Sequence, residues 1–290
     1  MTSDSKPFFG LLLMLIGAGL GAVDAALVRY VSPSVHPFVI GFTRALFGLL
    51  VFLPFILARP AILRSAFGPR HALRATLKLA SLIAFFIAFA SAPLADVMAI
   101  GFAAPIGVTI GSWLFLSERP RALRILGVIV GFVGVLIVLR PGQGGDMSAG
   151  LLFALLGAVL TAVIQLVLKP MSRRDSTETL VAWNLIWTVP IAAIPAALVW
   201  EMPSVTEWGL LAIQGALGMV AMGAITRAFS YADASLVAPV DFMRLPFAAV
   251  LGFALFAQEV PLTTWVGGAV IFASTLITAR SARARMPEEL

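Results

Sequence analysis

Long apolar runs, each long enough to cross a bilayer as a helix, limit most strongly what this chain can fold into. The hydrocarbon core of a bilayer is about 30 Å thick, which a helix crosses with about 20 apolar residues. Runs of this kind, bounded by charged residues or Gly, Pro, Ser and Asn clusters, occupy 8–29, 36–58, 72–92, 95–116, 121–140, 148–168, 178–200, 207–228, 235–257 and 262–280. Strands of a membrane barrel would alternate apolar and polar residues, whereas runs such as ILGVIVGFVGVLIVL are continuous. The sequence therefore predicts an all-α integral membrane protein with ten transmembrane helices.

The composition agrees with a lipid bilayer as the surroundings. Hydrophobic residues make up 60% of the chain and charged residues 12%, whereas soluble proteins are nearer half apolar and about a quarter charged. The net charge of +6 is spread over short gaps between the apolar runs. Because the basic residues form no continuous stripe with interleaved aromatic residues, we expect no nucleic-acid partner.

Catalytic and metal-binding patterns are absent from the sequence. The chain has no cysteine, which excludes disulfides, thiolate metal sites and cysteine nucleophiles. Its two histidines, His36 and His71, lie at predicted helix ends, and neither is beside a serine or carboxylate pattern that resembles a catalytic set. No GxSxG, HExxH, P-loop or GxGxxG motif occurs. We therefore expect no enzyme activity, no cofactor and no metal.

An internal repeat divides the chain into two similar halves. The stretch GLLLMLIGAGLGAVDAALVR (10–29) aligns with GLLFALLGAVLTAVIQLVLK (150–169), and Pro105, Gly111, Glu118, Pro120 and Gly127 align with Pro246, Gly252, Glu259, Pro261 and Gly268. This predicts five-helix units at 1–142 and 148–285, followed by a mobile cytoplasmic tail at 286–290. Because each unit has an odd number of spans, the two have inverted topology. Inverted repeats are common in secondary transporters, where the binding site lies near the membrane midplane.

The basic residues also predict the orientation in the plasma membrane, which we take to be a bacterial inner membrane. Cytoplasmic connections carry an excess of Lys and Arg. A cytoplasmic N-terminus places Arg29 and Arg140 outside and nearly all other basic residues inside, which makes both termini cytoplasmic. The residues placed inside are Lys6, Arg59, Arg64, Arg70, Arg74, Lys78, Arg119, Arg121, Arg124, Lys169, Arg173, Arg174, Arg280, Arg283 and Arg285.

Two corresponding segments carry a resemblance to a known family. They are APLADVMAIGFAAPIGVTIGSWLFLSERPRALRILGVIVGFVGVLIVLRPG (92–142) and ADASLVAPVDFMRLPFAAVLGFALFAQEVPLTTWVGGAVIFASTLI (232–277). In each, a short apolar helix with a central proline ends in glutamate and proline, and a glycine-rich helix follows. The pattern resembles the EamA-type members of the drug/metabolite transporter superfamily. The resemblance implies transport of a small-molecule substrate by alternating access, commonly export.

Within that family the chain resembles most the YddG-like amino-acid exporters, which handle aromatic and other neutral amino acids. The family also contains carriers for riboflavin and S-adenosylmethionine, so uptake or exchange of such a larger metabolite is the alternative. The resemblance does not identify the substrate or the direction of transport.

Charged residues inside the predicted spans are the first candidates for substrate binding or gating, because a charge in the bilayer must face the interior, pair or reach the surface. Asp24 and Arg44 fall in the outer half of the membrane, and Asn184, Asp241 and Arg244 fall in the inner half. Asp24 is either a proton-coupling group or the partner of Arg44 or Arg29. Asp241 and Arg244 share a helix face, so they form either a pair that allows insertion or a cytoplasmic gate.

The remaining candidates are uncharged. Pro105 and Pro246 either kink their helices or mark the site, because each frees a backbone carbonyl near midspan. Ser81 is either a helix–helix contact or a ligand group, and Phe85 and Trp187 either line a cavity or contact the core or lipid. The glycine-rich runs at 121–140 and 262–280 are expected at the periphery, where they brace the bundle or form a homodimer contact.

Overall fold

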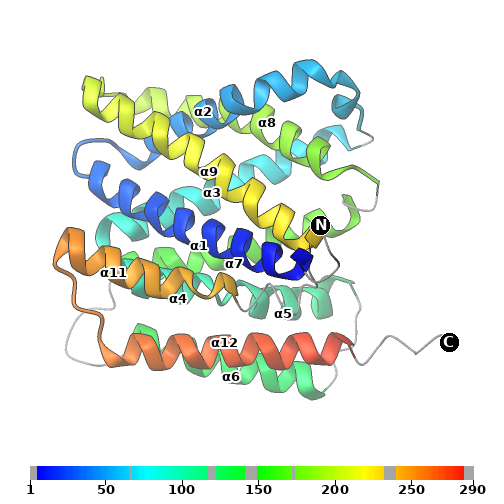
Figure 1. Cartoon of the computed structure of the whole chain (residues 1–290), viewed down its shortest axis with the longest axis vertical. Helices are drawn as coiled ribbons and strands as arrows, with labels where there is room; N and C mark the ends of the chain where they lie inside the picture. The colour runs from blue at the N-terminus through cyan, green and yellow to red at the C-terminus, as the bar shows by residue number, and fades with distance from the viewer. Residues whose placement is uncertain are drawn as a thin grey trace.

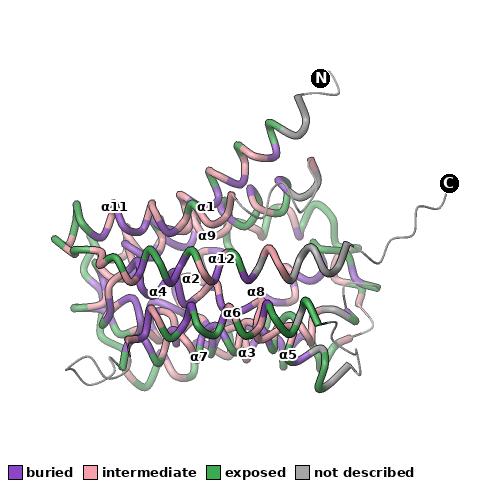
Figure 2. Tube along the Cα trace, turned by 90° about the horizontal axis from the view of Figure 1, so that it is seen from below, coloured by how far each residue is buried: buried purple, intermediate pink, exposed green. Residues whose placement is uncertain are grey.

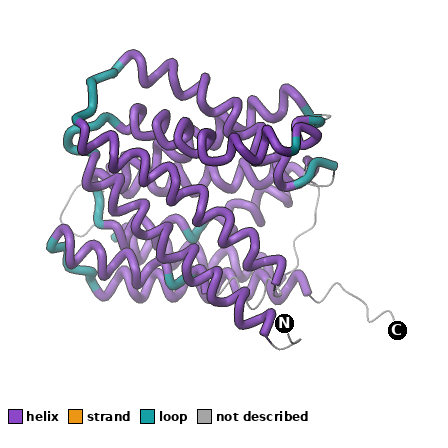
Figure 3. Tube along the Cα trace, turned by 45° about the horizontal axis from the view of Figure 1, so that its top comes forward, coloured by secondary structure: helices purple, strands orange, loops and turns teal. Residues whose placement is uncertain are grey.

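A computed structural model describes residues 5–65, 67–116, 122–140, 149–171, 174–231 and 240–283, and within these ranges the chain is helical with connecting turns (Figures 1 and 3). The elements are α1 (Ser5–Val31), α2 (Pro37–Ala58), the 3₁₀ turn η1 (Pro60–Leu63), α3 (Gly68–Ser91), α4 (Leu94–Gly101), α5 (Ala104–Leu116), α6 (Ala122–Leu139), α7 (Ala149–Met171), α8 (Thr177–Leu198), α9 (Val205–Tyr231), α11 (Arg244–Phe256) and α12 (Leu262–Arg283). Glu118, Pro120 and the expected tail at 286–290 lie outside the described residues.

Most of the helices are long and apolar enough to span a membrane. Among the described residues, seven meet this criterion: Phe8–Val31, Pro37–Ala58, Gly68–Ser91, Leu94–Gly111, Ala149–Leu168, Thr177–Leu198 and Val205–Ala228. Three shorter apolar helices, Ile125–Leu139, Arg244–Phe256 and Leu262–Ser274, coincide with the remaining expected spans. The structure thus confirms a multi-span helical membrane protein, with seven helices of full spanning length.

Local sequence explains where several helices begin. His36 precedes α2, and its Nδ1 accepts a hydrogen bond from the amide of Phe38 at 3.3 Å. Ser176 precedes α8, and its hydroxyl accepts from the amide of Thr179 at 3.2 Å. Such caps satisfy backbone donors that a helix leaves free at its first turn.

The two aligned prolines follow interruptions in helices. Residues 102–103 separate α4 from α5, and Pro105 is the second residue of α5. Residues 242–243 form a similar turn, and Pro246 is the third residue of α11. Proline is tolerated in a first helical turn because the amide it lacks would have no partner there. In place of the expected kinks near midspan, the structure has breaks between helices. Each proline lies in the first turn of the helix that follows the break.

Figure 1 shows α2 and α8 together at one edge of the bundle and α6 and α12 at the opposite edge. Between them, α1 packs against α9 and α3 packs against α7. The peripheral position expected for the two glycine-rich helices agrees with this arrangement. Their outer sides carry exposed apolar residues (Figure 2), including Ile129, Phe132 and Trp265.

Candidate functional site

A cavity of about 110 Å³ lies between α2, α3, α8 and α9, so both halves of the chain contribute to its walls. Its polar lining consists of Arg44, Arg74, Lys78, Asn184 and Thr188. Leucine and methionine side chains, together with the backbone of three glycines, form most of the rest of its surface. Cations at membrane depth are costly unless a partner is near, which makes this cavity the principal candidate for substrate binding.

Arg44 enters the cavity from α2 and is paired on its other side. Its guanidinium forms an ion pair with Asp24 of α1, and Gln214 of α9 lies beside the same carboxylate. The guanidinium lies directly against Gly218 of α9, where an added Cβ would be 2.7 Å from Nη2. Glycine at 218 therefore leaves the space that the arginine occupies.

Arg74 and Lys78 are four residues apart on α3 and so share one face of the helix. Arg74 is buried, and its guanidinium donates to the backbone carbonyl of Leu180 on α8, while its Nε has no hydrogen-bond partner. Lys78 makes no ion pair or hydrogen bond to any described residue, and the charged groups acting on it are Arg44 and Arg74.

Arg74 and Lys78, which the sequence assigned to the cytoplasmic side with the other basic residues, lie within α3 and line the cavity. The basic residues at 70, 74 and 78 follow a spacing of four along this helix, a pattern that is visible in the sequence.

Asn184 and Thr188 line the cavity from α8, also four residues apart. Thr188 is partnered, since its hydroxyl donates to the backbone carbonyl of Asn184 at 2.6 Å. Asn184 is 7% exposed, and its Oδ1 has no hydrogen-bond partner among the described residues. A buried polar atom left without a partner costs folding free energy, so this carbonyl oxygen is available to a ligand donor.

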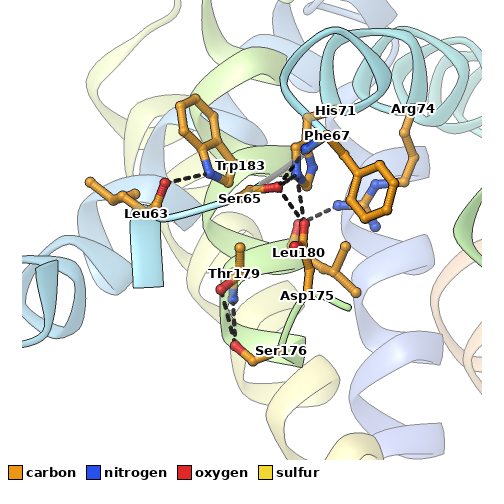
Figure 4. Close-up of polar contacts among 10 residues, drawn as sticks. All are labelled: Leu63, Ser65, Phe67, His71, Arg74, Asp175, Ser176, Thr179, Leu180 and Trp183. Carbon is orange, nitrogen blue, oxygen red and sulfur yellow. Dashed lines mark hydrogen bonds and ion pairs between the residues drawn. The ribbon is translucent and has the colours of Figure 1, made fainter. Parts of the chain in front are cut away.

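A polar cluster joins the two halves just beyond Arg74 (Figure 4). The Ser65 hydroxyl donates to Oδ2 of Asp175 at 2.5 Å and lies 2.8 Å from Nε2 of His71, which is itself 3.1 Å from the same oxygen. His71 is fully buried, and its ring stacks on Trp183 at a centroid distance of 5.8 Å. The cluster adjoins Arg74 and Leu180, which line the cavity.

The sequence shows no serine or carboxylate pattern resembling a catalytic set beside His71, and the structure brings Ser65 and Asp175 to its ring. The contacts are nevertheless not those of a hydrolase triad, in which serine and carboxylate use different ring nitrogens. Here both contact Nε2, and Nδ1 has no hydrogen-bond partner. The cluster therefore holds the α3 and α8 starts together.

The uncharged candidates other than Asn184 lie outside the cavity lining. Ser81 donates to the Gly157 carbonyl at 2.9 Å, and Phe85 packs against Gly157, so both belong to the α3–α7 contact. Trp187 is 36% exposed on α8. Arg44 and Asn184, expected in opposite halves of the membrane, line the same cavity.

Asp241 and Arg244 lie on either side of the second helix break, with 2.7 Å between Oδ1 and Nη2. The Arg244 guanidinium packs against Gly21 of α1, where an added Cβ would be 3.2 Å from Nε. Gly21 is one turn from Asp24 on the same helix. The Asp241–Arg244 pair therefore holds the helix break against α1, the helix that carries Asp24.

A second polar contact between the halves was missed from the sequence. Asp96 of α4 is buried, accepts a hydrogen bond from Thr264 of α12 and lies 3.5 Å from Nη2 of Arg140. Asp96 and Thr264 are 168 residues apart, so no local pattern pointed to the pairing.

Comparison with known proteins identifies a repeated match. The profile of the EamA-like transporter family matches residues 8–140 and again residues 148–280. A solved structure with 18% identity covers 98% of this chain and 99% of its own length, with a TM-score of 0.63. At that identity the likeness shows the fold alone.

Curated relatives match over nearly their whole length. The chain is 30% identical to a riboflavin transporter of Vibrio cholerae serotype O1 over 281 residues, which are 94% of each chain. It is 32% identical to the pseudopaline exporter CntI of Pseudomonas aeruginosa over 279 residues, covering 94% of this chain and 96% of the relative. It is 26% identical to an S-adenosylmethionine uptake transporter of Rickettsia bellii over 271 residues, covering 90% of each.

Proposed function

Because this chain belongs to the EamA-like transporter family of the drug/metabolite transporter superfamily, we propose that it is a secondary transporter that exports a small amino acid by alternating access. The observation that carries the proposal is the small cavity between α2, α3, α8 and α9, with cations on two walls and the free Oδ1 of Asn184 on a third.

The cavity lining matches the two polar ends of an amino acid. Arginine and lysine form charge-assisted hydrogen bonds with carboxylates, so Arg44, Arg74 and Lys78 bind the carboxylate end. The Asn184 Oδ1 accepts a hydrogen bond from the ammonium group, which satisfies an otherwise unpaired oxygen. Pockets for larger ligands usually measure about 300–1,000 Å³, and this cavity of about 110 Å³ favours a small substrate.

Uptake or exchange of a larger metabolite is the second candidate. It is favoured by the relatives, which are named for riboflavin and for S-adenosylmethionine uptake. For such a substrate the walls of the cavity would have to separate, as occurs when a transporter moves between its two open states.

We also propose that residues 1–142 and 148–285 form two inverted five-helix repeats. The packing supports this, since α1 contacts α9 while α7, its counterpart in the second half, contacts α3, the counterpart of α9. If each helix is replaced by its counterpart in the other half, the α1–α9 contact becomes the α7–α3 contact.

The proposed location is the bacterial inner membrane with both termini in the cytoplasm, supported by the distribution of basic residues between the spans. Ser34, between α1 and α2, is then outside. Because the chain has no cysteine, a Ser34→Cys variant reports its side directly. A membrane-impermeant thiol reagent should label it in intact cells, and labelling only in inverted vesicles would reverse the orientation.

Opening toward the cytoplasm requires contacts between the halves to break. We assign this role to the Ser65–His71–Asp175 cluster and, with it, to the contact between Gly21 of α1 and Arg244, which is paired with Asp241 at the helix break. Asp241→Ala and Arg244→Ala should each slow transport in vesicles. Wild-type rates in both variants would remove the pair from the gate.

Counterflow in proteoliposomes tests the proposed function. Vesicles with the purified protein are loaded with one unlabelled compound and given the same compound radiolabelled, from a panel of amino acids, riboflavin and S-adenosylmethionine, with and without a pH gradient. Accumulation of a labelled amino acid beyond equilibrium supports the proposal and excludes a channel. Counterflow of riboflavin or S-adenosylmethionine alone would favour the second candidate.

A further inference from the structure

The charges around the cavity point to a more specific substrate class. Resting on the proposed function, we infer that the transported amino acid carries a net negative charge, as an acidic amino acid or a similar small dicarboxylate does.

The first step is the pairing of the cations. Arg44 is neutralised by Asp24, with which it forms an ion pair. Arg74 donates to a neutral backbone carbonyl, and the carboxylate that acts on it is Asp175 of the Ser65–His71–Asp175 cluster. Lys78 has neither a carboxylate partner nor a hydrogen bond among the described residues. With Asp24 and Asp175 counted, the cavity keeps one positive charge that nothing in the described chain compensates.

The second step is the cost of that charge in a membrane. The Lys78 side chain lies in the interior of α3, away from the ends from which a lysine can reach water at the surface. A zwitterion brings no net charge and leaves the excess in place. A substrate with one net negative charge neutralises the excess positive charge of the cavity when it binds there.

The third step is the position of the groups. The second carboxylate of the substrate meets Lys78, one turn along α3 from Arg74 and opposite Asn184 on α8. Its first carboxylate binds the arginines, and its ammonium group donates to Asn184 Oδ1. Thus each lining group with spare hydrogen-bonding capacity has a partner in an acidic amino acid: Lys78, Arg74 Nε and Asn184 Oδ1.

Charge-matched pairs of compounds separate this inference from the proposed function. Binding of glutamate and glutamine, and of aspartate and asparagine, is measured on the purified full-length protein by calorimetry, since the members of each pair differ mainly in charge. The variants are Lys78→Met, which keeps the side-chain length without the charge, and Lys78→Arg, which keeps the charge. Arg70→Gln is the matched control, because Arg70 lies exposed on α3 and does not line the cavity.

The inference predicts that each acidic amino acid binds at least about tenfold more tightly than its amide. Lys78→Met should remove this preference, Lys78→Arg should retain it, and Arg70→Gln should leave it unchanged. Equal affinities within each pair would overturn the inference while leaving amino-acid transport intact. Binding of neutral amino acids alone would do the same. If none of the amino acids binds but riboflavin does, the proposed function fails, and the inference fails with it.

Discussion

At the scale of single residues, the charged groups at the cavity differ in their partners, and these partners define their roles. Asp24 and Arg44 hold one another across α1 and α2, so their charges cancel before any substrate enters. Lys78 has no such partner in the part of the chain that the structure describes. The first pair shapes the cavity, and the unpaired lysine defines what the cavity attracts.

The Asp24–Arg44 pair gives a prediction about stability. Asp24→Asn leaves the arginine without a counter-charge, and Arg44→Gln leaves the carboxylate, so each should lower the free energy of unfolding by about 3 kcal/mol. The double variant leaves neither charge and should cost clearly less than the sum. Unfolding of the four proteins in detergent measures this cycle, and strictly additive losses would show that the two residues do not depend on each other.

The sequence shows charged residues within the apolar runs, but it places only some of them correctly inside the bundle. Asp24 and Arg44 stand well inside apolar runs, so their burial was predictable. Arg74 and Lys78 stand near the start of the run at 72–92, and the distribution of basic residues assigned them to the cytoplasmic side, whereas the structure places them in the cavity lining. Asp175 meets Ser65 and His71 across 110 and 104 residues of sequence, and no local pattern indicates such a contact.

At the scale of helices, glycine determines how closely neighbours approach. The α6–α12 contact brings Gly134 and Gly267 together, where a Cβ on Gly134 would lie 2.9 Å from the Gly267 carbonyl oxygen and one on Gly267 would lie 2.8 Å from that of Gly134. Small residues of this kind allow close packing of membrane helices. The α6–α12 contact lies away from the cavity, at the edge of the bundle (Figure 1).

Gly134→Ala should therefore destabilise the protein without affecting the cavity. The added methyl meets backbone atoms of α12 that cannot turn aside, and overpacking of this kind costs about 1–3 kcal/mol. The matched control is Gly223→Ala on α9, where an added Cβ has nothing within 4 Å. Thermal unfolding in detergent and substrate affinity are measured together. A Gly134→Ala protein as stable as the control would refute the packing role.

For the helices too, features set by local sequence could be predicted, whereas features set by packing between distant segments could not. Apolar runs predicted the helices well because spanning requires length and composition, which are local properties. The two prolines correctly marked special positions in both halves, but a proline can kink a helix or start one. The sequence alone does not separate these two cases. In the structure Pro246 starts a helix after a break, and the Arg244 guanidinium at that break packs against Gly21.

At the scale of the whole molecule, both halves of the chain line one cavity. The Ser65–His71–Asp175 cluster joins the halves beside it, and Asp96 with Thr264 joins them elsewhere. Alternating access requires that the same cavity open to each side in turn. The central claim is therefore that substrate occupies this cavity, and that the cavity faces both sides during transport.

A single cysteine in the cavity tests that claim most directly, because the chain has none of its own. Met219 of α9 lines the cavity, whereas Thr76 on α3 is exposed outside it and serves as control. The measurement is the rate at which a membrane-impermeant thiol reagent labels each variant from either side of proteoliposomes, with and without the transported amino acid. The account predicts that Met219→Cys is labelled from both sides and protected by substrate, while Thr76→Cys shows no protection. Labelling of Met219→Cys from one side only, or at a rate that substrate does not change, would contradict it.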